Sequence, residues 1–163
     1  MGMLLVFVIA LISGCSTSIK EQQKEAVKNV NEAFSNQPKA AKKSTKHLKL
    51  YLPFGMAIQK DSPNNVIMKR GNQNYLLFYN QKVDKKGKEV YKISKPNKGI
   101  LLDKNFTSKE KFGYLFVSKV KKNLYEVTVG IGGIKMTTET DMKNIASDAE
   151  KMMKIVSSVK YRK

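Results

Sequence analysis

Cysteine, histidine and tryptophan are nearly missing from this chain, which has one cysteine, one histidine and no tryptophan among 163 residues. A lone cysteine excludes an intramolecular disulfide and, without further ligands, a thiolate zinc site. A metal site or a Ser-His-Asp triad would depend on His47 alone, and we expect that residue to face solvent. Acidic residues are also scarce, 13 against 31 Lys and Arg, and none form the carboxylate pair that glycoside hydrolysis requires. We therefore expect a protein that is not an enzyme and uses no cofactor or metal.

A long apolar run is missing as well. The longest one, residues 3–12, has about ten residues, whereas a membrane-spanning helix needs about 20. A run of this length is typical of the apolar region of a secretory signal peptide. Met1 and Gly2 carry no Lys or Arg, although signal peptides usually begin with positive charge. Either the start of the protein lies upstream, or the signal is weak.

The four residues that end at the cysteine are Ile12, Ser13, Gly14 and Cys15. They resemble the lipobox of bacterial lipoproteins, in which an aliphatic residue and two small residues precede the cysteine. The resemblance implies that a signal peptidase recognises Ile12, Ser13 and Gly14 and cleaves before Cys15, which carries a diacylglycerol. The other interpretation, a buried free thiol, is disfavoured because soluble domains rarely open with a bare apolar run. We expect a lipoprotein on the extracytoplasmic face of the cell membrane.

Residues 19–34 show apolar spacings of three, four and seven, which predicts an amphipathic helix. Ser18 with Glu21 three residues later predicts a capping box at its start. The helix could form a stalk, a partner-binding surface or a layer on its own domain.

Residues 35–46 have no apolar periodicity and predict a basic linker. Its lysines are Lys39, Lys42, Lys43 and Lys46. Beside a lipid anchor such lysines would be attracted to anionic headgroups by about 1 kcal/mol each, and a merely solvated loop is an equally good interpretation.

From residue 47 onward the apolar period changes to two, which predicts strands. The expected strands are residues 47–58, with a kink at Pro53–Gly55, and residues 66–70, 75–79, 89–93, 112–117, 125–129 and 134–138. We expect 75–79 to be central and covered on both faces, and residues 100–102 to form a small buried segment. Gly130–Gly133 lacks the spacing of a phosphate-binding loop, so we expect a bulge or a close backbone approach there.

Residues 141–159 carry one apolar stripe that includes Met152 and Met153, which predicts a long C-terminal helix lying across the sheet. We expect both methionines to be core residues, and Thr138 or Asp141 to cap the helix.

The pattern as a whole predicts an α+β fold, with an antiparallel sheet packed by the two helices in a sandwich-like α/β/α arrangement. We divide the chain into a signal peptide (1–14), a lipidated N-terminus with helix and basic linker (15–46), and a globular domain (47–163). The LPFG bend at residues 52–55 and the closing segment 155–160 resemble PsbP-like lipoprotein domains over about two-thirds of the chain. That resemblance implies a non-enzymatic auxiliary or assembly role and assigns no functional residue.

A formal charge of +18 is the remaining functional signal. Candidate contacts for a polyanion are Lys39, Lys42, Lys43, Lys46, Lys85, Lys86, Lys88, Lys121 and Lys122. Lysine predominates over arginine, which favours diffuse attraction over specific phosphate recognition, and no nucleic-acid-binding motif is present. We expect a non-enzymatic binding or accessory protein of the cell envelope, whose partner is anionic lipid, cell-wall polymer or a membrane-protein complex. The alternative function is a carrier that holds a small apolar ligand between sheet and helix.

Overall fold

The structure is a computed structural model that describes residues 18–162. The signal peptide and the lipobox residues Ile12, Ser13, Gly14 and Cys15 lie outside the described residues. The helices are α1 (Ile19–Ser35), α2 (Glu89–Ser94) and α3 (Ile145–Ser158), with a 3₁₀ turn η1 (Met142–Asn144) before α3. The strands are β1 (Lys43–Ser44), β2 (Leu48–Leu50), β3 (Met56–Ser62), β4 (Asn65–Arg70), β5 (Gln73–Tyr79), β6 (Ile100–Thr107), β7 (Phe112–Lys121), β8 (Leu124–Ile131), β9 (Ile134–Thr140) and β10 (Lys160–Tyr161).

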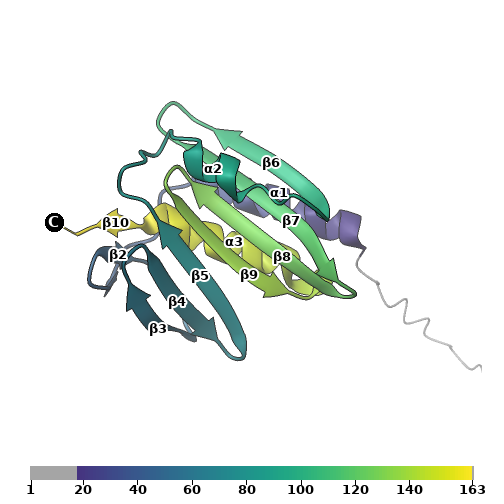
Figure 1. Cartoon of the computed structure of the whole chain (residues 1–163), viewed down its shortest axis with the longest axis horizontal. Coiled ribbons are helices and arrows are strands. Elements are labelled where there is room, and N and C mark those ends of the chain that lie inside the picture. The colour runs from purple at the N-terminus through teal and green to yellow at the C-terminus, as the bar shows by residue number, and fades with distance from the viewer. Residues whose placement is uncertain (1–17, 163) are drawn as a thin grey trace, which may run out of the picture.

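Seven antiparallel strands form the main sheet in the order β3-β4-β5-β9-β8-β7-β6, and β1, β2 and β10 form a second, small sheet. The single kinked strand expected over residues 47–58 is wrong, because the turn before Met56 separates β2 and β3, which belong to different sheets. Helices α1 and α3 pack side by side on one face of the main sheet, and α2 lies across the other face over β7 (Figure 1). The expected α+β fold, with an antiparallel sheet packed by the N-terminal and C-terminal helices, is confirmed.

Helix α1 belongs to the same core as the sheet. Ser18 and Glu21 form the predicted capping box, which satisfies two backbone N–H groups at the start of the helix. Ala26, Val30 and Phe34 are buried in one cluster with residues of the sheet and of α3. Of the three roles considered for this helix, a layer on its own domain is the one the structure has.

The main sheet has two distinct ends. We call the end at Ser18, where α1 begins, the proximal end. The first turn of α3 lies there, because the N–H of Ala146 donates to Gln22 Oε1 at 3.1 Å. The start of β6 lies there too, because Gln23 Nε2 donates to the carbonyl of Leu101. The β4–β5 and β7–β8 turns also lie at this end, because the start of β5 and the start of β8 both pair with the end of β9. The opposite, distal end holds residues 80–88 and the small sheet. Helix α1, with 17 residues, separates the two ends by about 25 Å.

Residues 89–93, expected as a strand, form helix α2 instead. The segment crosses the face of the sheet over β7, whose outer edge pairs with β6. The helical turn lets Tyr91 reach three rings on β7, with centroid distances of 5.3 Å to Phe112 and 5.4 Å to Tyr114 and Phe116. Tertiary packing therefore overrides the strand preference of Val, Tyr and Ile here.

Two expectations about burial are also wrong. Strand β5 is central, but only its helix-facing side chains are buried, and Leu76 on the opposite face is 42% exposed. Residues 100–102 begin the edge strand β6, where Ile100 and Leu101 are exposed because no element lies beyond the edge.

The C-terminal helix is confirmed, and Met152 and Met153 are fully buried core residues. Its expected cap is wrong. Asp141 makes no capping hydrogen bond, because the 3₁₀ turn η1 intervenes, and the hydroxyl of Thr138 donates to the carbonyl of Asn74.

Gly132 and Gly133 form the two-residue turn between β8 and β9. The expected bulge or close approach between strands is therefore wrong here: the close approach is to a loop, since a Cβ on Gly132 would lie 2.1 Å from the carbonyl oxygen of Asp84.

Candidate functional site

No described residues form a catalytic constellation. Within residues 18–162, no group of three or more His, Cys, Asp or Glu is placed to hold a metal ion. His47 is half-buried rather than fully exposed as expected, and its backbone carbonyl accepts a hydrogen bond from the N–H of Arg162. The candidate sites are therefore surfaces and hollows that could bind a partner.

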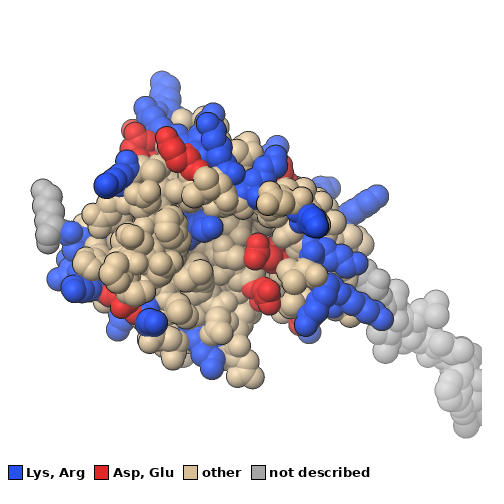
Figure 2. All heavy atoms as spheres, in the orientation of Figure 1, with Lys and Arg blue, Asp and Glu red and all other residues tan. Residues whose placement is uncertain are grey.

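Basic side chains dominate the rim of the molecule. Figure 2 shows Lys and Arg around the edge of one face, whereas the face between is mostly uncharged and includes some Asp or Glu on its right side. Only three lysines of the described chain, Lys95, Lys151 and Lys154, form an ion pair with a carboxylate. The other Lys and Arg side chains of residues 18–162 form no ion pair with a carboxylate in that part of the chain.

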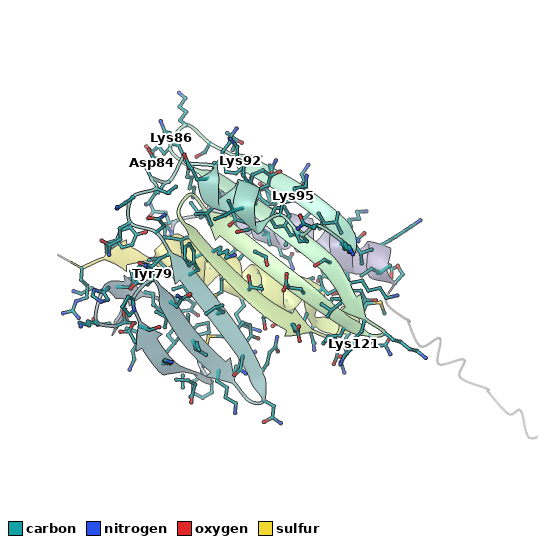
Figure 3. The ribbon with its side chains drawn as sticks, viewed as in Figure 1. Tyr79, Asp84, Lys86, Lys92, Lys95 and Lys121 are labelled. Carbon is teal, nitrogen blue, oxygen red and sulfur yellow. The ribbon has the colours of Figure 1, made fainter. Side chains whose placement is uncertain are left out.

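The structure separates the predicted polyanion contacts into two groups. Lys121 and Lys122 lie at the β7–β8 turn of the proximal end, and the others lie at the distal end; Figure 3 shows Lys121 and Lys86 at opposite ends. We call the second group the distal lysines. They are Lys39, Lys42, Lys43, Lys46, Lys85, Lys86 and Lys88, all exposed.

Two carboxylates near the distal lysines, those of Asp84 and Asp61, accept hydrogen bonds from backbone groups. Asp84 Oδ1 accepts from the N–H groups of Lys86 at 2.7 Å and Gly87 at 2.8 Å, and Asp61 Oδ2 accepts from the N–H of Lys46 at 2.6 Å. These aspartates therefore stabilise the loops that present the lysines.

One further lysine, Lys111, was not among the sequence candidates. Its ammonium group lies over the ring of Phe34, 4.5 Å from the centroid, and donates to the carbonyl of Phe34. Burial lowers the pKa of Lys111, and the positive charge of Lys85 lowers it further, against a smaller opposite effect of Glu110. Two lysines 26 positions apart in sequence are thus neighbours, which no local pattern could reveal.

One hollow is a cleft of about 810 Å³ on the open face near the proximal end. Its apolar lining comes from Ile67, Leu76 and Leu124, and Thr137 and Glu139 add polar groups. The sequence analysis expected β5 to be covered on both faces and therefore did not predict this exposed face.

A buried polar network lies behind the cleft. Asp148, only 2% exposed, accepts from Tyr75 Oη at 2.9 Å, Gln73 Nε2 at 2.9 Å, Thr140 Oγ1 at 2.7 Å and Lys151 Nζ at 2.7 Å. Burial alone would raise the pKa of Asp148, but the hydrogen bonds from Lys151, Gln73 and Thr140 outweigh it and hold the pKa below its usual range. Because every donor is matched, this network ties α3 to the sheet and is structural.

A second hollow, of about 340 Å³, lies at the distal end between the β8–β9 turn and the segment after α3. Ile131, Ile134 and Val159 give it an apolar floor, and Lys85 and Lys160 lie at its margin. Between the sheet and α3 themselves, by contrast, the side chains of Leu77, Met136 and Met152 are fully buried.

Comparison with known proteins adds no functional assignment: neither a protein-family model nor a curated protein matches this chain. None of the helices in residues 18–162 has the length and apolar character to cross a bilayer.

Proposed function

We propose that the chain is a lipoprotein of the cell membrane, anchored through Cys15 on the extracytoplasmic face, and that it binds an anionic polymer of the envelope without catalysing a reaction. The observation that carries the proposal is the set of distal lysines, which make no ion pair with a carboxylate of the described chain. The lipobox resemblance supports the anchor, and the charge supports the class of partner.

Distance favours a polymer over lipid as the partner of the distal lysines. Two residues, Ser16 and Thr17, join Cys15 to Ser18, and α1 then carries the chain about 25 Å to the distal end. At physiological ionic strength the Debye length is about 8 Å. Lysines held 25 Å from a membrane surface gain little from its headgroups, whereas a polymer that extends outward can reach them.

The polymer proposal is tested by binding the protein to immobilised poly(glycerol phosphate). Raising the ionic strength from about 0.1 M to about 1 M shortens the Debye length from about 10 Å to about 3 Å and should abolish binding. The variant Lys85→Gln/Lys86→Gln/Lys88→Gln should bind more weakly than the control Lys69→Gln/Lys104→Gln/Lys143→Gln, which has the same net charge and alters exposed lysines on other segments. Equal loss in both variants would refute a localised site, and salt-independent binding would refute the electrostatic mechanism.

A second candidate function, carriage of a small apolar ligand, is favoured by the 340 Å³ distal hollow, which is within the size range of ligand pockets. In this alternative the ligand lies beside Ile131 and Val159 rather than between sheet and helix. Native mass spectrometry of protein purified from its own host distinguishes the two functions, since a carrier retains a bound mass that Ile134→Lys removes. Recovery of the bare chain mass would exclude the carrier.

A further inference from the structure

Exposed apolar side chains gather at the proximal end. Phe54 is 99% exposed in the turn before β3, and Ile100, Leu101 and Val120 are 37%, 40% and 49% exposed at the start of β6 and the end of β7. Three other large apolar side chains of the described chain reach this exposure, Leu76, Ile93 and Tyr161. Most of the exposed apolar groups thus belong to segments at one end of the sheet.

The register of the sheet places these segments together. Met56 at the start of β3 pairs with Arg70, and the strands β5, β9, β8 and β7 follow in order to the turn beside Val120. Strands β3 and β6 are six spacings apart, so the proximal end is about 29 Å wide. An end of that width is broad enough to contact a flat membrane surface.

Positive charge accompanies the apolar groups. Lys98 precedes β6, and Lys119, Lys121 and Lys122 surround Val120. The one carboxylate in residues 98–104 and 118–124, Asp103, is paired with Lys95 at 2.7 Å. The exposed carboxylates elsewhere at this end are Glu21 at the start of α1 and Glu139 and Asp141 at the end of β9. Exposed apolar side chains among unpaired lysines are the combination that adsorbs to an anionic bilayer surface.

The chain length before Ser18 brings this end to the membrane. Cys15 is three residues from Ser18, so a fully extended link reaches about 10 Å. Helix α1 begins on the side of the molecule where β7 ends and β6 begins (Figure 1). With Cys15 lipidated, the proximal end cannot move far from the lipid headgroups.

We propose that the proximal end is a membrane-contact surface, in which Phe54 and Val120 insert into the interface of an anionic bilayer while Lys121 and Lys122 contact its headgroups. This inference rests on the proposed lipid anchor at Cys15. It fixes the orientation of the protein, with the distal lysines pointing away from the membrane.

Depth measurements with single tryptophans test the inference, because the chain has no tryptophan of its own. Lipidated protein carrying Phe54→Trp, Val120→Trp or the distal control Tyr161→Trp is reconstituted into phosphatidylglycerol vesicles that contain brominated lipid. We expect quenching and a blue shift for the two proximal reporters and neither effect for the control. Adding Lys121→Gln/Lys122→Gln to Val120→Trp should lower the equilibrium constant for contact of this end with the membrane by about fivefold for each lysine.

Quenching of the distal reporter, or of none of the three, would overturn the membrane-contact surface and leave the anchor standing. Mass spectrometry of the same preparations reports the anchor separately. An unmodified Cys15 would refute the proposed function, so the two failures are distinguishable.

Discussion

Removal of the Asp148 carboxylate should be among the most damaging single changes in the chain. Asp148→Ala leaves four donors without their acceptor, and two of them, the hydroxyls of Tyr75 and Thr140, are on side chains at most 5% exposed. Lys151 and Gln73 lie nearer the surface and can be hydrated. Breaking a buried charged network by removing one partner costs about 3–5 kcal/mol of the free energy of unfolding. At about 3 °C per kcal/mol for a domain of this size, the melting temperature should fall by about 10 °C.

Urea unfolding followed by circular dichroism measures this loss, with Glu150→Ala as the matched control. Glu150 pairs with Lys154 on the same helix, but both side chains are at least one-third exposed, so its removal should cost below about 1 kcal/mol. An Asp148→Ala cost as small as that of the control would refute the structural role of the network.

The difference in unfolding free energy between wild type and Asp148→Ala depends on pH, because the pKa of Asp148 is lowered in the folded protein. A carboxyl whose pKa is lower in the folded than in the unfolded state, where it is about 3.9, stabilises the fold above that pH. The contribution is lost as the pH falls through the folded-state value. The difference between wild type and Asp148→Ala should therefore be largest at neutral pH and shrink below about pH 4.

Two further predictions concern backbone and packing. Gly71→Ala and Gly132→Ala both place a Cβ on a residue with positive φ, but only the Gly132 substitution also meets backbone atoms, at 2.1 Å from the carbonyl oxygen of Asp84. Gly71→Ala should lower the free energy of unfolding by about 1 kcal/mol and Gly132→Ala by clearly more, as measured by thermal unfolding. Equal losses would contradict the packing of residues 80–85 on the β8–β9 turn. Tyr91→Ala should cost about 3 kcal/mol and speed amide exchange in α2, because it removes the ring that contacts Phe112, Tyr114 and Phe116; unchanged exchange would contradict that docking.

Features that depend on local sequence were predictable. The Ser18 and Glu21 capping box and the apolar stripe of α3 depend on spacings of three and four, and the β7–β8 hairpin on alternation around a polar turn. These interactions join residues that are close in the sequence, so local sequence patterns predict them.

Features that depend on distant segments were not predictable. Residues 89–93 favour a strand by composition, but they form a helix that packs Tyr91 on three aromatic rings of β7, residues 21 to 25 positions later in the chain. The Asp148 network joins residues from 73 to 151, and Lys111 meets Lys85 through the folded loops. The division into proximal and distal lysines requires the direction of α1 relative to the sheet, which no spacing in the sequence contains.

Mass spectrometry of the tryptic peptide that ends at Lys20 tests the central claim most directly. Protein extracted from host membranes should yield a peptide that begins at Cys15 and carries the mass of a diacylglycerol, and Cys15→Ala should yield neither the cleavage nor the lipid. Recovery of an unmodified Cys15 still joined to residues 1–14 in the membrane fraction would contradict the account.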